Sequence, residues 1–170
     1  MFRCAKFALI ASWLLCAGNT AAQSVDEEKE HAVIELGGAA FRNVTDGASS
    51  FGPAAAVEVT PIKNWLELEC GTTVLFRRHS TEWGTDLVFK KPWDLSPRVE
   101  FMLGLGPEWI HSKLYGITAN SVSAEAVADF MFWRSPKHRF GWYVEPTYEY
   151  SFASGHEKSV GVTGGLLISF

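Results

Sequence analysis

The sequence predicts an all-β fold, an eight-stranded antiparallel up-and-down transmembrane β-barrel. Turn residues divide the chain into eight segments in which apolar residues recur at every second position. One face of these segments is apolar throughout, whereas the opposite face carries most of the charge. The final segment, 160–170, has no charged residue, and its apolar side chains alternate with mostly small ones. That pattern is typical of a strand between lipid and a narrow lumen.

The first four expected strands cover residues 31–41, 52–60, 65–77 and 83–90. Their shared apolar face is formed, in order, by Ala32, Ile34, Leu36 and Ala40; by Ala55, Val57 and Val59; by Leu66, Leu68, Cys70, Thr72, Val74 and Phe76; and by Trp83, Thr85, Leu87 and Phe89. Turn-forming or polar residues lead us to expect connections at 43–50, 61–64 and 78–82.

The last four expected strands cover residues 98–110, 121–133, 142–152 and 160–170. Their apolar face is formed by Val99, Phe101, Leu103, Leu105, Pro107 and Trp109; by Val122, Ala124, Ala126, Ala128, Phe130 and Phe132; by Trp142, Val144, Pro146, Tyr148, Tyr150 and Phe152; and by Val160, Val162, Leu166, Ile168 and Phe170. Connections are expected at 91–97, 111–120, 134–138 and 153–158.

The charged face indicates which side of the strands points into the barrel, because charged groups cannot face hydrocarbon without a large cost in free energy. We therefore expect the apolar face outside and the charged face in the lumen. The expected lumen residues are Lys90 and eleven acids, Glu35, Glu58, Glu67, Glu69, Asp86, Glu100, Glu108, Glu125, Asp129, Glu145 and Glu149. Aromatic residues near strand ends suggest two interfacial girdles, at Trp65, Trp83, Trp109, Trp142, Tyr150, Phe152 and Phe170.

An even number of strands puts both chain ends on one side. With a periplasmic start, the turns at Pro61, Pro92 and Pro136 would be periplasmic. The outward connections would be those around Asp46, His79, Tyr115 and Gly155. A barrel of this size is just wide enough for its own side chains to fill.

The first residues predict export. Arg3 and Lys6 precede an apolar run at 7–17, and small residues up to Ala22 offer a cleavage site, so 1–22 reads as a signal peptide and 23–170 as the barrel domain. The apolar run is too short for a spanning helix. A lipoprotein signal would use Cys16, but Leu15 before it is too large for the usual site.

Composition excludes some partners and crosslinks. The chain has 15 basic and 19 acidic residues, and cleavage after Ala22 removes two of the bases, Arg3 and Lys6. An acidic chain without a basic patch argues against nucleic acid as a partner. Of three cysteines, only Cys70 lies after the signal, so no disulfide is expected within the mature chain.

The signal, the eight alternating strands and the terminal Phe170 resemble the small outer-membrane β-barrel proteins of Gram-negative bacteria, of the OmpA-transmembrane or OmpX type. The ending Val162, Leu166, Ile168, Phe170 resembles the signal that the barrel-assembly machinery recognises, with Gly164 at one apolar position. The resemblance implies an outer-membrane location, contact with lipid and lipopolysaccharide, and assembly by that machinery, but no activity.

Three candidate chemistries follow from particular residues. The acids of the lumen could form a polar core, a cation site or a narrow cation path. His79, His111 and His156 would all lie at the outward end, where imidazoles could bind a divalent metal, although no close-spaced ligand motif supports this. Glu108, His111 and Ser112 resemble the His, Ser and acid of outer-membrane lipid A deacylases, but here His and Ser are adjacent and alternation separates them.

The prediction for function is therefore a monomeric integral outer-membrane barrel with a structural or surface-interaction role and an acidic, polar lumen. No cofactor, metal or catalytic residue is assigned. A small cation-selective pore is the first alternative, and a lipid A-modifying enzyme is the second.

Overall fold

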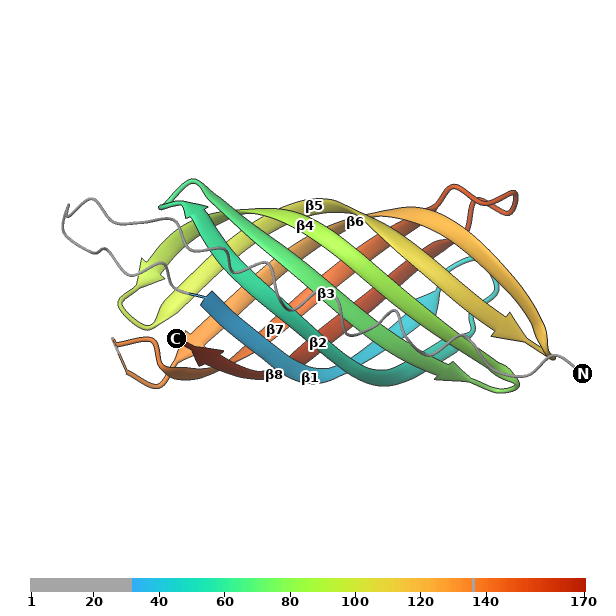
Figure 1. The fold of residues 1–170 in the computed structure, drawn as a ribbon, viewed down its shortest axis with the longest axis horizontal. Coiled ribbons are helices and arrows are strands. Elements are labelled where there is room, and N and C mark those ends of the chain that lie inside the picture. Colours follow the sequence, from blue (N-terminus) through green and yellow to red (C-terminus); the bar gives the residue numbers. More distant parts are fainter. Residues whose placement is uncertain (1–31, 136) are drawn as a thin grey trace, which may run out of the picture.

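The computed structural model describes residues 32–135 and 137–170, which form a closed barrel of eight antiparallel strands (Figure 1). The strands are β1 Ala32–Asn43, β2 Ser49–Ile62, β3 Leu66–Arg77, β4 Ser80–Ser96, β5 Val99–Leu114, β6 Ile117–Trp133, β7 Phe140–Ser151 and β8 Lys158–Ser169. The predicted fold class is confirmed. The expected signal peptide at 1–22 lies outside the described residues. Within the described ranges, no helix is long and apolar enough to cross a membrane.

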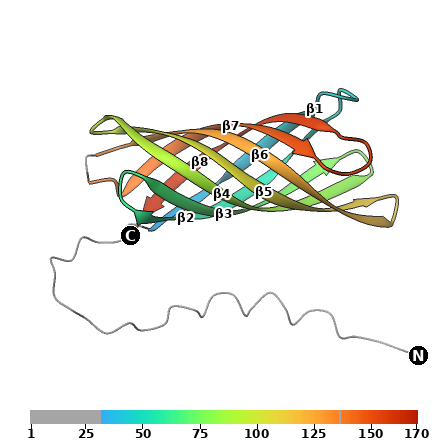
Figure 2. The same ribbon diagram turned by 90° about the horizontal axis from the view of Figure 1, so that it is seen from above.

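Each strand pairs with its neighbour in sequence, and β1 pairs with β8 to close the barrel. The strands are strongly tilted and the barrel is elongated (Figure 2). We call the end with the β1–β2, β3–β4, β5–β6 and β7–β8 connections the loop end. The opposite end, with the β2–β3, β4–β5 and β6–β7 connections and the C-terminus, is the turn end.

The expected loop at 111–120 is wrong, because most of it is paired strand. His111 pairs with Asn120, and Leu114 pairs with Ile117. Only Tyr115 and Gly116 turn the chain, and both have positive φ, 48° and 85°. Two such residues match the twist of a two-residue hairpin, so β5 and β6 continue past the apolar face into the loop end.

The connections expected at 91–97 and 78–82 are also shorter than the sequence suggested. β4 runs through Pro92 to Ser96, and the turn consists of Pro97 and Arg98 instead. The register of β3 with β4 ends where Glu67 pairs with Lys90. A proline is tolerated beyond that point because no β3 residue requires its missing N–H. At the other end of β4, Arg78 and His79 alone form the connection.

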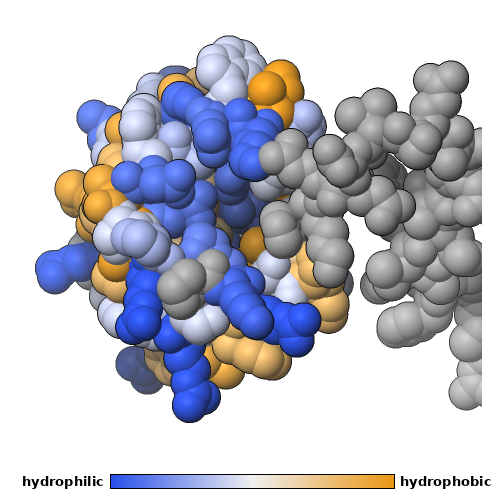
Figure 3. All heavy atoms as spheres, turned by 90° about the vertical axis from the view of Figure 1, so that its left-hand side faces the viewer, coloured by the Kyte–Doolittle hydropathy of each residue, from blue (hydrophilic) through white to orange (hydrophobic). Residues whose placement is uncertain are grey.

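Alternation separates an apolar exterior from a polar interior. Exterior side chains such as Leu105, Trp109 and Leu166 are 68%, 63% and 63% exposed. Seen from the turn end, hydrophilic residues cover much of the surface and hydrophobic ones lie mainly toward the edge (Figure 3). Lys91, next to the buried Lys90, reaches the Asn64 carbonyl and lies over the Trp93 ring at 5.7 Å. A lysine at an aromatic rim is typical of a side chain whose charge reaches toward water.

A small apolar layer fills the interior toward the turn end. Its members are Val33, Met102, Met131, Trp133, Tyr143 and Leu167. Trp133 stacks on His138 with ring centroids 4.9 Å apart. The alternation of apolar and polar residues does not by itself predict this inward-facing apolar layer. Methionine fits such a space because its unbranched side chain adapts to an irregular gap.

Candidate functional site

The interior is organised around one buried lysine. Lys90 is fully buried on β4, and its Nζ lies 3.0 Å from Asp129 Oδ2 and 2.8 Å from Glu145 Oε2. It also pairs with Glu69 and lies 3.5 Å from Glu58 Oε2. We call Lys90 with Glu58, Glu69, Asp129 and Glu145 the lysine cluster. It joins β2, β3, β4, β6 and β7 across the lumen.

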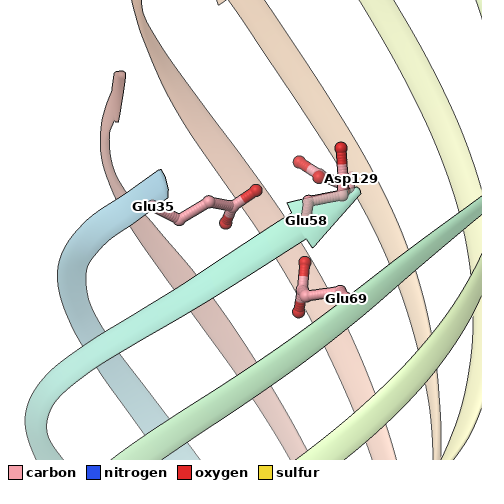
Figure 4. A group of neighbouring side chains, drawn as sticks. All are labelled: Glu35, Glu58, Glu69 and Asp129. Atoms are coloured by element: carbon pink, nitrogen blue, oxygen red, sulfur yellow. The ribbon is translucent and has the colours of Figure 1, made fainter. Parts of the chain in front are cut away.

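Four acids around the lysine converge as metal ligands would. Carboxylate oxygens of Glu35, Glu58, Glu69 and Asp129 all lie within 4.8 Å of one another, and the side chains point toward a common centre (Figure 4). The Lys90 ammonium contacts three of these four acids. The ammonium group therefore takes the position that a cation would take among them.

Strand register explains why these acids meet. Glu58 on β2 pairs directly with Glu69 on β3. Like charges at directly opposed positions repel each other in a sheet. Lys90 pairs with Glu67, two residues before Glu69 on β3, and places its ammonium beside both Glu58 and Glu69. The lysine thus compensates a repulsion that the hydrogen-bonding register imposes.

The lysine cluster divides the lumen. An open mouth of about 580 Å³ lies at the loop end, and one of about 770 Å³ lies at the turn end. Between them is an inner cavity of about 50 Å³, on the loop-end side of the cluster. Lys90 lines none of these three spaces. Glu69 and Glu145 face the inner cavity, whereas Glu58 lines the turn-end mouth.

The other expected lumen acids lie on either side of the cluster. Glu35, Asp86, Glu108, Glu125 and Glu149 line the inner cavity. Glu67 and Glu100 line the turn-end mouth.

Of the five acids that line the inner cavity outside the lysine cluster, two have protein donors. The Gly71 N–H donates to Asp86 Oδ1 at 2.9 Å, and the Ser123 hydroxyl donates to Glu108 Oε2 at 2.7 Å. Glu35 Oε1 and Glu125 Oε1 are buried and have no hydrogen-bond partner. The interior therefore contains two kinds of acid site, one organised by a lysine and one without a base.

No protein-family model matches the chain, and no curated protein matches it. Solved structures do match. Neisserial surface protein A, NspA, aligns with a TM-score of 0.65 at 13% identity, over 82% of this chain and 96% of that one. Ail, the attachment invasion locus protein of Yersinia pestis, aligns with a TM-score of 0.56 at 16% identity, over 84% and 99%. Ail bound to the heparin analogue sucrose octasulfate gives the same values. The fold is that of a small outer-membrane β-barrel. At these identities the likeness concerns the fold alone.

The histidines at the loop end do not gather. His79 stacks on Tyr115 at 5.3 Å, His111 shares a 2.7 Å hydrogen bond with Asn120, and Tyr150 lies 3.1 Å from His156. Among the described residues, the acids around Lys90 are the only group of three or more His, Cys, Asp or Glu with metal-like spacing. Each histidine is therefore engaged separately, His111 and His156 within their own hairpins and His79 with the neighbouring β5–β6 turn.

The residues considered for lipid chemistry are also separated. Glu108 is buried and bonded to Ser123, His111 is exposed and bonded to Asn120, and Ser112 lines the loop-end mouth. His111 and Ser112 thus lie on opposite faces of β5, as alternation requires. These three residues do not form a hydrogen-bonded set.

Of the terminal residues proposed for assembly, Leu166 and Ile168 lie on β8, and Phe170 directly follows it. Leu166 and Phe170 are 63% and 67% exposed on the barrel exterior, and Ile168 is half-buried. The Phe170 N–H donates to the Ala32 carbonyl at 3.0 Å, so the chain end is held against β1.

Proposed function

We propose that the protein is an integral outer-membrane β-barrel, exported by its signal peptide, with a structural or surface-interaction role rather than a transport role. The observation that carries this proposal is the inversion of an ordinary globular protein: carboxylates are buried while large apolar side chains are exposed around the barrel. Such an exterior is stable only when lipid covers it. The likeness in fold to NspA and Ail supports the same location.

Aromatic side chains support a membrane boundary at each end. Exposed Trp83, Trp109 and Phe152 lie toward the loop end, and exposed Trp65, Trp142 and Phe170 lie toward the turn end. Amphipathic rings concentrate at the two membrane interfaces. The loop end would then face outward, with β1–β2 and β7–β8 tied together by the Asn43 amide, which donates to Glu157 Oε2 at 2.7 Å.

The lysine cluster argues against the pore alternative. An ion crossing the lumen would have to displace Lys90 from several carboxylates at once, at a site without solvent exposure. Breaking a buried ion pair costs about 3–5 kcal/mol. We therefore propose a lumen that is closed in the resting state.

The outward partner proposed is the anionic part of lipopolysaccharide. A shallow rim groove at the loop end is lined by Arg77, His79, Lys113 and Tyr115, among others. Basic side chains beside an aromatic ring suit a phosphate group at a membrane surface. The solved complex of Ail with sucrose octasulfate is an example of a small outer-membrane barrel that takes a polyanion.

The location and closed lumen are tested together. Full-length protein expressed in a Gram-negative host should fractionate with the outer membrane and migrate faster on gels before boiling than after. Purified protein in planar bilayers should give no steady current. The proposal would be contradicted if the unheated protein migrated at the same position as the boiled protein, or if the bilayers showed a sustained cation-selective current.

The lipopolysaccharide partner is tested separately. Lipopolysaccharide should raise the melting temperature of the detergent-solubilised barrel, and Lys113→Ala should reduce that rise. Lys91→Ala, at the turn end, is the matched control and should leave the rise unchanged. Equal loss in both variants would indicate a nonspecific charge effect.

A further inference from the structure

Basic residues gather at the turn end in two neighbouring connections. The β4–β5 turn includes Arg98, and the β6–β7 connection, residues 134–139, includes Arg134, Lys137 and Arg139. We call Arg98, Arg134, Lys137 and Arg139 the basic turn cluster. Neither connection contains an acidic residue, although the chain as a whole is acidic. Positive charge is therefore concentrated at one place on the turn end.

Hydrogen bonds hold these two connections side by side. The Trp133 N–H donates to the Arg98 carbonyl at 2.8 Å, at the start of the β6–β7 connection. Within that connection, His138 Nε2 lies 3.2 Å from the Pro97 carbonyl oxygen, and the His138 ring stacks on Trp133. The β6–β7 connection is thus fixed against the β4–β5 turn. The bases of both connections therefore belong to one surface.

The side chains of the basic turn cluster are free to contact a ligand. All four are exposed. Within the described ranges, none of the four has an ion pair or a side-chain hydrogen bond. The acids closest in sequence to Arg98 are Asp94 and Glu100, which lie opposite each other on β4 and β5. The charge of the cluster is therefore not neutralised by paired acids of the barrel.

A surface of aromatic rings adjoins the cluster. Phe132 stacks on Trp142 with ring centroids 4.0 Å apart, and Phe101 lies 5.8 Å from Trp93 and 4.9 Å from Phe130. These rings lie on the exterior, close to the turn-end termini of β4, β5, β6 and β7. Aromatic rings concentrate where a membrane meets water. The basic turn cluster, just beyond the rings, therefore lies at the level of the lipid headgroups.

We propose that the basic turn cluster binds the headgroup of an anionic phospholipid, whose acyl chains lie along the aromatic rings. This inference rests on the proposed outer-membrane location and names the lipid class selected at the turn end. Guanidinium and ammonium groups donate to phosphate oxygens, and clusters of about four to eight bases at a membrane surface are typical of anionic-lipid recognition. The cationic group of a zwitterionic lipid would be repelled by the same bases. The cluster should therefore select a lipid with net negative charge, such as phosphatidylglycerol.

Native mass spectrometry of the folded barrel tests this selectivity. The full mature chain is refolded in vesicles with equal amounts of phosphatidylglycerol and phosphatidylcholine, extracted in mild detergent and sprayed from about 0.15 M ammonium acetate, where weak surface charge effects are screened. Wild type should retain phosphatidylglycerol over phosphatidylcholine by about fivefold or more, the effect expected of a base at a membrane surface. Arg98→Gln, Arg134→Gln, Lys137→Gln and Arg139→Gln in one variant should remove this preference.

The matched control removes four exposed bases from the loop end instead, through Arg42→Gln, Arg78→Gln, Lys113→Gln and Lys158→Gln. This control should keep the preference for phosphatidylglycerol. Equal losses in the two variants would indicate a nonspecific charge effect and overturn the proposal. Loss of the wild-type preference in millimolar inorganic phosphate would also overturn it, because the site would then take a small anion and not a lipid.

Two further outcomes separate this inference from the proposed location. A folded barrel that inserts into the vesicles but retains both lipids equally would overturn the lipid site alone. A protein that does not insert at all would contradict the membrane location itself. If the fourfold variant lacks the folded, heat-modifiable band, Lys137→Gln with Arg139→Gln provides the comparison and should lose part of the preference.

Discussion

Lys90 shows how a single residue can organise the interior of a barrel. Its ammonium group is fully buried and contacts four carboxylates from four other strands. We expect Lys90→Met to lower the free energy of unfolding by about 3–5 kcal/mol, because the acids lose their only close counter-charge in the cluster. Urea unfolding in micelles, followed by tryptophan fluorescence, measures the change.

Lys91 provides the control for this experiment, because it is the next residue of β4 and has the same side chain. Its ammonium contacts the Asn64 carbonyl and lies over the Trp93 ring, away from the lysine cluster. Lys91→Met should change the free energy of unfolding by no more than about 1 kcal/mol. Equal losses in the two variants would contradict the role assigned to Lys90.

Asp46, in the β1–β2 loop, provides a prediction for pH. The Ala48 N–H donates to Asp46 Oδ1 at 2.9 Å, and Arg77 lies 2.7 Å from Oδ2. These two contacts, the backbone one first, hold the pKa of Asp46 below its ordinary value. Because the pKa is lower in the folded state, the stabilisation is present above the unfolded pKa of about 3.9. It is lost as pH falls through the folded value.

An NMR titration of the Asp46 carboxyl carbon measures this pKa. Arg77→Ala should move the pKa upward but only part of the way, because the Ala48 hydrogen bond remains. A wild-type pKa equal to that of a free peptide would contradict the assignment.

At the scale of residues, the sequence predicts which side chains line the interior better than it predicts which of them contact each other. Period two separates Lys90 and the acids from the apolar face, and those acids lie inside or half-buried in the barrel. Which acid faces Lys90 depends on how far each strand is shifted along its neighbour. This register, which for example pairs Glu67 with Lys90, is not determined by the local pattern of apolar and polar residues. The apolar layer around Met102 and Met131 was missed for a related reason, since scattered apolar residues among polar ones have no period of their own.

At the scale of elements, the apolar face marks where a strand meets hydrocarbon but not where pairing ends. β5 ends at Leu114 and β6 begins at Ile117, although the residues of both strands next to the turn are mostly polar. Backbone hydrogen bonds continue in water because they do not depend on the side chains. The sequence therefore identified all eight strands while placing several ends too early.

The closing contact between β1 and β8 gives a prediction for one element. A Cβ at Gly37 would lie 2.2 Å from the Gly164 carbonyl oxygen, which is part of the backbone and cannot move freely. Gly37→Ala should therefore lower the free energy of unfolding by about 1–3 kcal/mol, the usual cost of overpacking. The urea midpoint and the fraction of heat-modifiable protein after refolding measure the effect.

Gly38 is the control, one residue further along the same strand. Its added Cβ would lie 3.5 Å from the Gly52 carbonyl oxygen, an ordinary contact distance. Gly38→Ala should refold like wild type. If Gly38→Ala is as unstable as Gly37→Ala, the cause is general to glycine in β1 and not the approach of β8.

At the scale of the whole molecule, the assignment of sides decides every other interpretation. The exterior contains a natural probe of that assignment, because Cys70 is an exposed free cysteine between Val57 and Leu87, which are 47% and 41% exposed. In the proposed orientation this thiol faces the hydrocarbon of the bilayer. The other two cysteines of the chain, Cys4 and Cys16, can be changed to serine so that Cys70 is the sole thiol.

We expect a membrane-impermeant maleimide to leave Cys70 unlabelled when the refolded protein is in lipid vesicles, because the charged reagent does not enter hydrocarbon and thiolate forms poorly there. After denaturation in detergent and urea, the same thiol should react fully. Ser154→Cys in a Cys70→Ser background places the thiol in the exposed β7–β8 connection and should be labelled in vesicles. Labelling of Cys70 in vesicles as fast as the loop variant would mean that water, and not lipid, surrounds the apolar face.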